Sequence, residues 1–259
     1  MNLEQDYSFD LTTEEIFWLS GMFGLLHFPF IEIRSRANYD TASLRRGQIR
    51  LQERGWIQYQ PSRGWRVDPL PAAVMRWITD AGISLSVLIR SRNEKVRRCD
   101  LYRFEDAGLV ITFEEEMFHF HISYHYANLL IFLKLLMPDL VMEEFTAPGS
   151  YNLIQPEEMV LAAWNKAAGL PKAISRQGFL DRENQLLIKW LKGMTWFGQL
   201  TCQRTIKPLS TPIRFFVCGD NTANWSAEED MATGRHLLLP ANGKAIHDWL
   251  GKNLEYELS

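Results

Sequence analysis

Residues 101–123 read LYRFEDAGLVITFEEEMFHFHIS, and this stretch decides the fold. Its β-branched and aromatic residues nearly alternate with polar ones, as in strands with one buried face. The alternation breaks at EDAG (105–108) and again at EEE (114–116), and each break is short enough for a tight connection. Short connections join antiparallel neighbours. The stretch therefore predicts antiparallel strands.

A helix is expected near the start of the chain, in LTTEEIFWLSGMFGLLHFPF (residues 11–30). It opens with a capping box, in which Thr12 is followed three residues later by Glu15. The positions Ile16, Leu19 and Phe23 share one face of this helix. The segment therefore predicts an amphipathic helix that packs on the rest of the protein.

The residues between this helix and the strands predict two further helices and a hairpin. A helix should run from the Asp40/Thr41 cap to Arg54, where Gly55 ends it. WIQYQPSRGWRVD (56–68) then predicts two short strands around a PSRG turn. The helix PLPAAVMRWITDAG (69–82) follows, and SLSVLIRSR (84–92) predicts another strand.

The rest of the chain repeats this order of helices, strands and a closing helix. Ser123 is placed to cap a helix in YANLLIFLKLLM (126–137) that closes the first half, 1–150. The second half, 151–259, has the following expected elements: helices in 155–170 and 181–193, strands in 197–206, 212–220 and 234–240, and a closing helix in 242–258. We expect an α+β fold with a largely antiparallel central sheet flanked by two helical groups. The two similar halves predict pseudo-two-fold symmetry.

Charge is distributed unevenly along the 259 residues, of which 46% are hydrophobic and 23% charged. Residues 34–103 contain 15 Lys and Arg against 6 Asp and Glu, a net +9, whereas the other residues have 13 against 25, a net −12. Such asymmetry is typical of nucleic-acid binding, or of two surfaces that meet partners of opposite charge. The composition itself is that of a globular domain with a substantial core.

The first residues lack the basic start and apolar run of a signal peptide, so we expect a cytoplasmic location. Residues 126–137 are too short to span a bilayer, and Lys134 interrupts them, which predicts no membrane partner. The three cysteines form no CxxC pair and indicate neither a disulfide framework nor a zinc site.

No motif indicates catalysis, a cofactor or a metal. The chain has no GxSxG, P-loop or GxGxxG sequence, and EEE is typical of a solvated turn. His119, His121 and His125 are spaced so that a metal site is conceivable. Phe118, Phe120 and Ile122 alternate with the first two and better explain the buried face, which leaves these histidines on the polar face.

A basic pattern favours a nucleic-acid hypothesis. Arg46, Arg50 and Arg54 recur every fourth residue of the second helix, and the hairpin after it resembles a wing from which Arg63 and Arg66 would reach phosphates. Few side chains on this helix suit base recognition. The same basic helix would also pack on acidic neighbours, so winged-helix regulation is the alternative interpretation.

The order of elements resembles the EspG family, cytosolic chaperones of type VII (ESX) secretion. The segments that carry the resemblance are LTTEEIFWLSGMFGLLHFPF (11–30), LQERGWI (51–57) and DMATGRHLLLPANGKAIHDWL (230–250). In the last, Asp230 and the Gly-Arg pair match the family, while MAT replaces the usual small residues between them. The resemblance implies a non-catalytic chaperone that binds helical PE/PPE-type clients, with a winged-looking element that does not bind DNA.

We expect the partner-binding residues in two loops between strands. One loop, SRNEKVRR (91–98), contains Arg97 and Arg98, which are either contacts to an acidic partner or a solvated turn. The other, DNTANWSAEE (220–229), contains Asn221, Asn224 and Trp225. Trp225 lacks periodic apolar neighbours and is either an exposed anchor or folded back on the core. DNA binding requires Arg46, Arg50 and Arg54 on an open surface, whereas a chaperone permits their burial against acidic neighbours.

Overall fold

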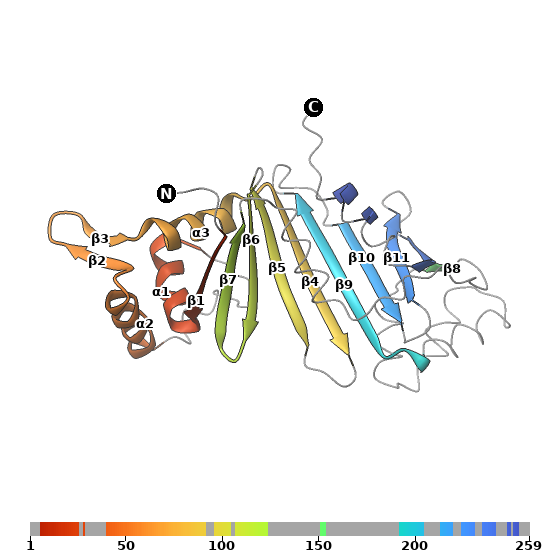
Figure 1. The fold of residues 1–259 in the computed structure, drawn as a ribbon, viewed down its shortest axis with the longest axis horizontal. Coiled ribbons are helices and arrows are strands. Elements are labelled where there is room, and N and C mark those ends of the chain that lie inside the picture. The colour runs from red at the N-terminus through yellow and green to blue at the C-terminus, as the bar shows by residue number, and fades with distance from the viewer. Residues whose placement is uncertain are drawn as a thin grey trace, which may run out of the picture. The chain divides into compact units, whose positions relative to one another are not determined.

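The computed structural model describes residues 6–25, 28, 40–91, 96–104, 107–123, 151–153, 192–204, 213–219, 224–230, 235–241, 248–249 and 251–253 (Figure 1). Within these residues the elements follow one another in this order: β1 (Tyr7–Thr12), α1 (Thr13–Phe23), α2 (Thr41–Glu53), β2 (Ile57–Gln60), β3 (Gly64–Val67), α3 (Pro69–Asp80), β4 (Ile83–Ser91), β5 (Arg97–Phe104), β6 (Ala107–Glu114), β7 (Met117–Ser123), β8 (Tyr151–Leu153), β9 (Trp196–Arg204), β10 (Ile213–Gly219), β11 (Asn224–Asp230) and β12 (Arg235–Ala241). The α+β fold with antiparallel strands is confirmed.

The chain divides into two compact units. One comprises Met1–Leu85, Arg98–Phe132 and Arg204–Ser210, and the other comprises Ser86–Arg97, Leu133–Gln203 and Thr211–Ser259. The boundary passes through three strands, because the first residues of β4, all but the first residue of β5 and the last residue of β9 belong to the first unit. A duplication that relates residues 1–150 to 151–259 stays a prediction.

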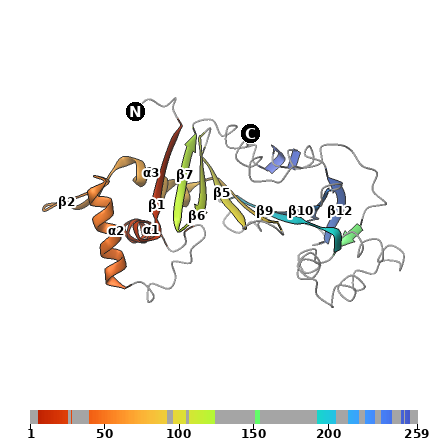
Figure 2. The same ribbon diagram turned by 60° about the horizontal axis from the view of Figure 1, so that its bottom comes forward.

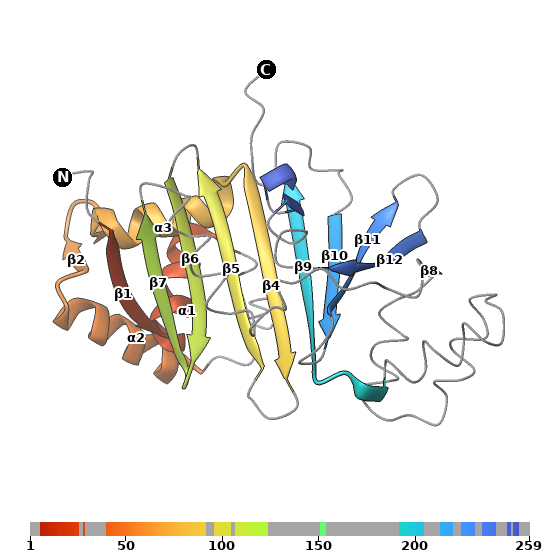
Figure 3. The same ribbon diagram turned by 45° about the vertical axis from the view of Figure 1, so that its right-hand side comes forward.

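In the first unit the strands lie in the order β1-β7-β6-β5, and helices cover one face of this sheet. Figure 3 shows α1 and α3 behind β1, β7 and β6. Alternate strand residues fill the space between sheet and helices: Leu11, Leu109, Ile111, Phe118, Phe120 and Ile122 pack with Ile16, Leu19, Val74 and Met75. The alternation predicted for residues 118–122 is therefore confirmed.

Helices α2 and α3 begin and end close to the predicted residues. Helix α1 begins at the predicted cap but ends at Phe23, with Gly24 as its C-cap, before the HFPF sequence (27–30) that was expected to close it. The Thr12/Glu15 capping box starts α1, and Asp40 caps α2 through a hydrogen bond from the Ser43 backbone. α2 ends before Gly55, whose φ of +73° is the left-handed conformation that glycine adopts readily. Asp68 caps α3 and accepts a hydrogen bond from the Leu70 backbone.

Helix α2 lies outside α1 and packs against it rather than on the sheet (Figure 2). The β2–β3 hairpin follows α2, with Tyr59 opposite Trp65 and Gln58 opposite Arg66. Gly64, at φ +76°, closes its three-residue turn, as expected for a left-handed position next to a type I turn. The predicted PSRG turn is therefore confirmed.

The second unit contains most of β4. Its strands lie in the sheet in the order β4-β9-β10-β11-β12-β8. Trp196, Phe197, Leu200 and Cys202 of β9 are buried. Trp249, in the expected closing helix, is also buried, and residues 248–249 and 251–253 are helical. The helices expected in 126–137 and 155–170 lie outside the described residues, as does nearly all of the one expected in 181–193.

Three strands were not predicted: β1, β8 and β11. β1 (Tyr7–Thr12) pairs with β7 along its whole length, with Tyr7 opposite Ile122 and Thr12 opposite Met117. β11 (Asn224–Asp230) lies between β10 and β12. The prediction that residues 220–229 form a loop is therefore wrong from Asn224 onward. The polar residues of β11 hid a strand that pairing on both sides stabilises.

Candidate partner-binding surfaces

Two arginines of α2 share one carboxylate of α1. Arg46 Nε donates to Glu14 Oε1 at 2.7 Å, and Arg50 Nη1 donates to Glu14 Oε2 at 2.8 Å. The hydrogen bond to Glu14 raises the pKa of Arg46 above its ordinary value. Their side chains are 52% and 46% exposed, and Glu14 neutralises one of their two charges. These two positions therefore hold α2 on α1 instead of standing free for phosphates.

The third arginine of the stripe, Arg54, makes three contacts. Its Nε lies 3.3 Å from Oε1 of Glu15, a carboxylate with no exposed surface, and its Nη1 donates to the Asp10 carbonyl at 2.7 Å. Its guanidinium also lies over the Trp56 ring, 5.3 Å from the centroid. Glu15 Oε2 accepts from the Thr12 backbone at 2.7 Å. Arg54 thus joins the end of α2 to the helix cap and to strand β1.

Gly47 explains how α2 approaches α1 closely enough for these pairs. A Cβ built at this position would lie 2.2 Å from the Glu14 carbonyl oxygen, a distance that real Cβ atoms do not show. Gly47 and Leu51 are the buried residues of α2. The small apolar face of α2 is therefore the result of a close helix–helix contact at Gly47.

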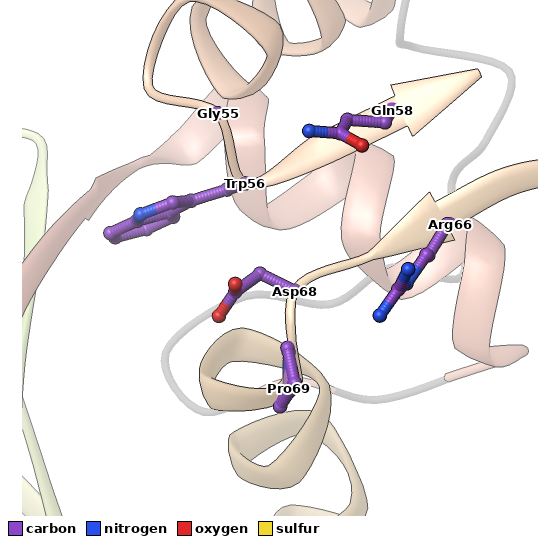
Figure 4. A pocket seen from close by; sticks show the side chains of 6 residues that line it. All are labelled: Gly55, Trp56, Gln58, Arg66, Asp68 and Pro69. Atoms are coloured by element: carbon purple, nitrogen blue, oxygen red, sulfur yellow. The ribbon is translucent and has the colours of Figure 1, made fainter.

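The two hairpin arginines differ from the three on α2. Arg63 and Arg66 are exposed, and no carboxylate pairs with either among the described residues. Arg66 helps line a pocket of about 190 Å³ between the hairpin and the start of α3 (Figure 4). Figure 4 shows Gln58 and Arg66 on the two strands, with Asp68 and Pro69 at the helix end of the pocket.

Arg97 and Arg98 lie at the start of β5 instead of in the preceding loop. Arg98 Nη2 is 3.6 Å from Oδ2 of the buried Asp100. Burial raises the pKa of the neighbouring Cys99 thiol far above its ordinary value, and the Asp100 charge adds to this. Cys99 is therefore a buried, protonated thiol and not a nucleophile.

The second predicted surface is only partly described. Asn221 lies outside the described residues. Asn224 and Trp225 open β11, where Asn224 pairs with Gly219 and Ala241, and Trp225 with Cys218 and Pro240. Their positions are thus in a strand with neighbours on both sides, and their predicted role in partner binding stays a prediction.

The histidines form pairs across β1 and β7. His119 Nδ1 lies 2.6 Å from Asp10 Oδ1, and His121 Nδ1 lies 2.7 Å from Ser8 Oγ. His125 lies outside the described residues. In the described part of the chain, no group of three His, Cys, Asp or Glu side chains is arranged to hold a metal ion. The polar face predicted for His119 and His121 is confirmed.

Sequence reasoning missed the residues that partner the arginines. Glu15 was noted only for helix capping and Glu14 not at all, although their position on the first turn of a helix could have suggested ion pairs. β1 had a clearer signal, since Tyr7, Phe9 and Leu11 alternate with polar residues. No helix among the described residues is long and apolar enough to cross a membrane.

The chain matches no known protein-family profile, and no curated protein sequence resembles it. A likeness appears at the level of structure. The fold is similar to that of the type VII secretion system chaperone EspG5 of Mycobacterium tuberculosis, solved in complex with a PE25–PPE41 dimer. The match covers 96% of both chains with a TM-score of 0.61 and 12% sequence identity. The chain therefore shares the architecture of an EspG chaperone at very low sequence identity.

Proposed function

We propose that the chain is a cytoplasmic, non-catalytic chaperone that binds a helical client protein and keeps it soluble for secretion. The observation that carries this proposal is the likeness of fold to EspG5 over nearly the whole of both chains. EspG5 was solved with a bound PE25–PPE41 dimer, and a comparable helical client is the partner we propose here. At 12% identity the client's identity does not transfer with the fold.

The pairing of the α2 arginines also supports a protein partner. Duplex DNA binding draws its affinity from arginine and lysine contacts to phosphates. Glu14 and Glu15 already engage Arg46, Arg50 and Arg54, so binding DNA there would require breaking these pairs. Of the arginines that the winged-helix alternative requires, the three on α2 are paired with glutamate, and the two on the hairpin, Arg63 and Arg66, are exposed.

We assign client contacts to two separate segments. The first is the start of β5, where Arg97 and Arg98 would meet acidic residues of the client. The second comprises Asn224 and Trp225 at the start of β11, together with Asn221, three residues earlier in the sequence. Trp225 would supply an aromatic anchor there.

The experiment that tests this function is purification of the tagged full chain from its own cells at moderate salt, with and without nuclease. We expect a stoichiometric, mainly helical protein that nuclease does not remove. When produced alone, that protein should aggregate, and co-expression with the full chain should keep it in solution. Recovery of nucleic acid alone, lost with nuclease or at higher salt, would overturn the proposal.

Variants of the assigned contacts then test the surface. Trp225→Ala should weaken the reconstituted complex by about tenfold or more if the ring is an interface anchor. Arg76→Ala, which removes an exposed arginine from α3, is the matched control and should leave affinity unchanged. Equal effects of both substitutions would place the client elsewhere.

A further inference from the structure

The β2–β3 hairpin exposes an aromatic face. Tyr59 is 59% exposed, the highest value among the exposed large hydrophobic residues of the described chain. Its ring lies 5.2 Å from that of Trp65, its direct cross-strand partner, and the Trp65 ring lies 5.6 Å from that of Trp18 on α1. The three rings therefore form a continuous row from the hairpin to the core, which Trp18 and Trp65 both contact.

Helix α1 extends this apolar surface. Met22 lies one turn beyond Trp18 on the same side of the helix and is 43% exposed. Figures 1 and 2 show the hairpin extending away from α1 and α3. We call the surface of Trp18, Met22, Tyr59 and Trp65 the hairpin face. Tyr59 and Met22 are exposed, while Trp18 and Trp65 are partly buried, and exposed apolar side chains grouped in this way are typical of interaction sites.

The charged residues of the hairpin itself have one sign. Between Gly55 and Val67 the chain contains Arg63 and Arg66 and no acidic residue. Both guanidinium groups are exposed and lack a carboxylate partner among the described residues, whereas those of α2 have Glu14 and Glu15. Asp68, the nearest acidic residue after the hairpin, caps α3. A ligand with negative charge therefore complements this element.

We propose that the hairpin face docks an acidic, apolar segment of a partner protein, at a surface separate from the client contacts assigned above. Tyrosine, tryptophan and arginine are the residue types that contribute most binding energy at protein interfaces, and the hairpin presents all three. Two exposed guanidinium groups are few for nucleic acid, where specific complexes typically involve several phosphate contacts. The aromatic rings bind the apolar side chains of the segment, and Arg63 and Arg66 pair with its carboxylates.

The test uses a labelled 15-residue helical probe peptide with leucine and phenylalanine on one face and glutamate on the other. Fluorescence anisotropy with the full chain should show saturable binding that a matched peptide with lysine in place of glutamate does not reproduce. Tyr59→Ser and Arg63→Glu should each weaken binding by about tenfold, as expected for interface anchors. Tyr59→Phe should retain affinity, and Arg76→Glu, the same charge reversal on α3, should change it little.

Circular dichroism shows whether each variant is folded, so that lost binding is not mistaken for lost structure. Several outcomes overturn the proposal: equal binding of the glutamate and lysine peptides, unchanged affinity of the Tyr59→Ser variant, preferential binding of a labelled oligothymidylate, or a concentration-dependent dimer abolished by Arg63→Glu. The last two would assign the hairpin face to nucleic acid and to a second copy of the chain, respectively. None of these results bears on the helical client.

Discussion

At the scale of single residues, Gly47 decides whether α2 can lie against α1. Gly47→Ala should destabilise the protein by about 1–3 kcal/mol, because the added methyl overlaps the Glu14 carbonyl and the two helices must separate. Gly21→Ala is a matched control on α1: nothing lies within 4 Å of its Cβ, and alanine should stabilise the helix by about 0.5–1 kcal/mol. Urea denaturation measures both. Destabilisation by both substitutions would contradict the close-contact explanation.

Arg54 and Arg50 lie on the same side of α2 but should contribute differently to the free energy of unfolding. Arg54→Ala should cost about 1–3 kcal/mol, since it leaves the fully buried Glu15 without its cation and the Asp10 carbonyl without its donor. Arg50→Ala removes a half-exposed pair with Glu14 and should cost less than about 1 kcal/mol. Thermal denaturation at low and high salt checks both values. Salt should weaken the Arg50 contribution more, and an equal cost for the two variants would refute this order.

At the scale of elements, the β6–β7 turn is strained. Glu115 and Glu116 adopt φ values of +50° and +67°, the left-handed region that a side chain disfavours. Glu116→Gly should stabilise the protein by about 1 kcal/mol, measured as a higher melting temperature. Glu116→Ala keeps the Cβ while removing the charge. An equal gain from alanine would attribute the effect to the acidic cluster and not to the backbone.

The elements also show what sequence patterns can predict. The capping box at Thr12, the glycine after α2 and the PSRG turn are local signals, and the structure confirms each of them. β11 could not be predicted in this way, because its residues NWSAEED lack an apolar alternation and become a strand only between β10 and β12. The ion pairs of Arg46, Arg50 and Arg54 depend likewise on which helix lies beside α2, and no local spacing specifies that neighbour.

At the scale of the whole molecule, two buried cysteines report on the two units. Cys99 belongs to the first unit and Cys202 to the second, and both side chains are essentially inaccessible. In the native protein neither should react with a thiol reagent, because burial blocks access and the raised pKa of Cys99 further disfavours its thiolate. Each thiol therefore becomes reactive only when its own unit opens.

Strands β4, β5 and β9 are each divided between the units, so neither unit contains every residue of its own strands. We therefore expect one cooperative transition, in which the two thiols become reactive at the same urea concentration. Single-thiol proteins, made by replacing Cys218 and either Cys99 or Cys202 with serine, allow each curve to be followed by mass spectrometry. Two separated midpoints would instead show that the units unfold independently.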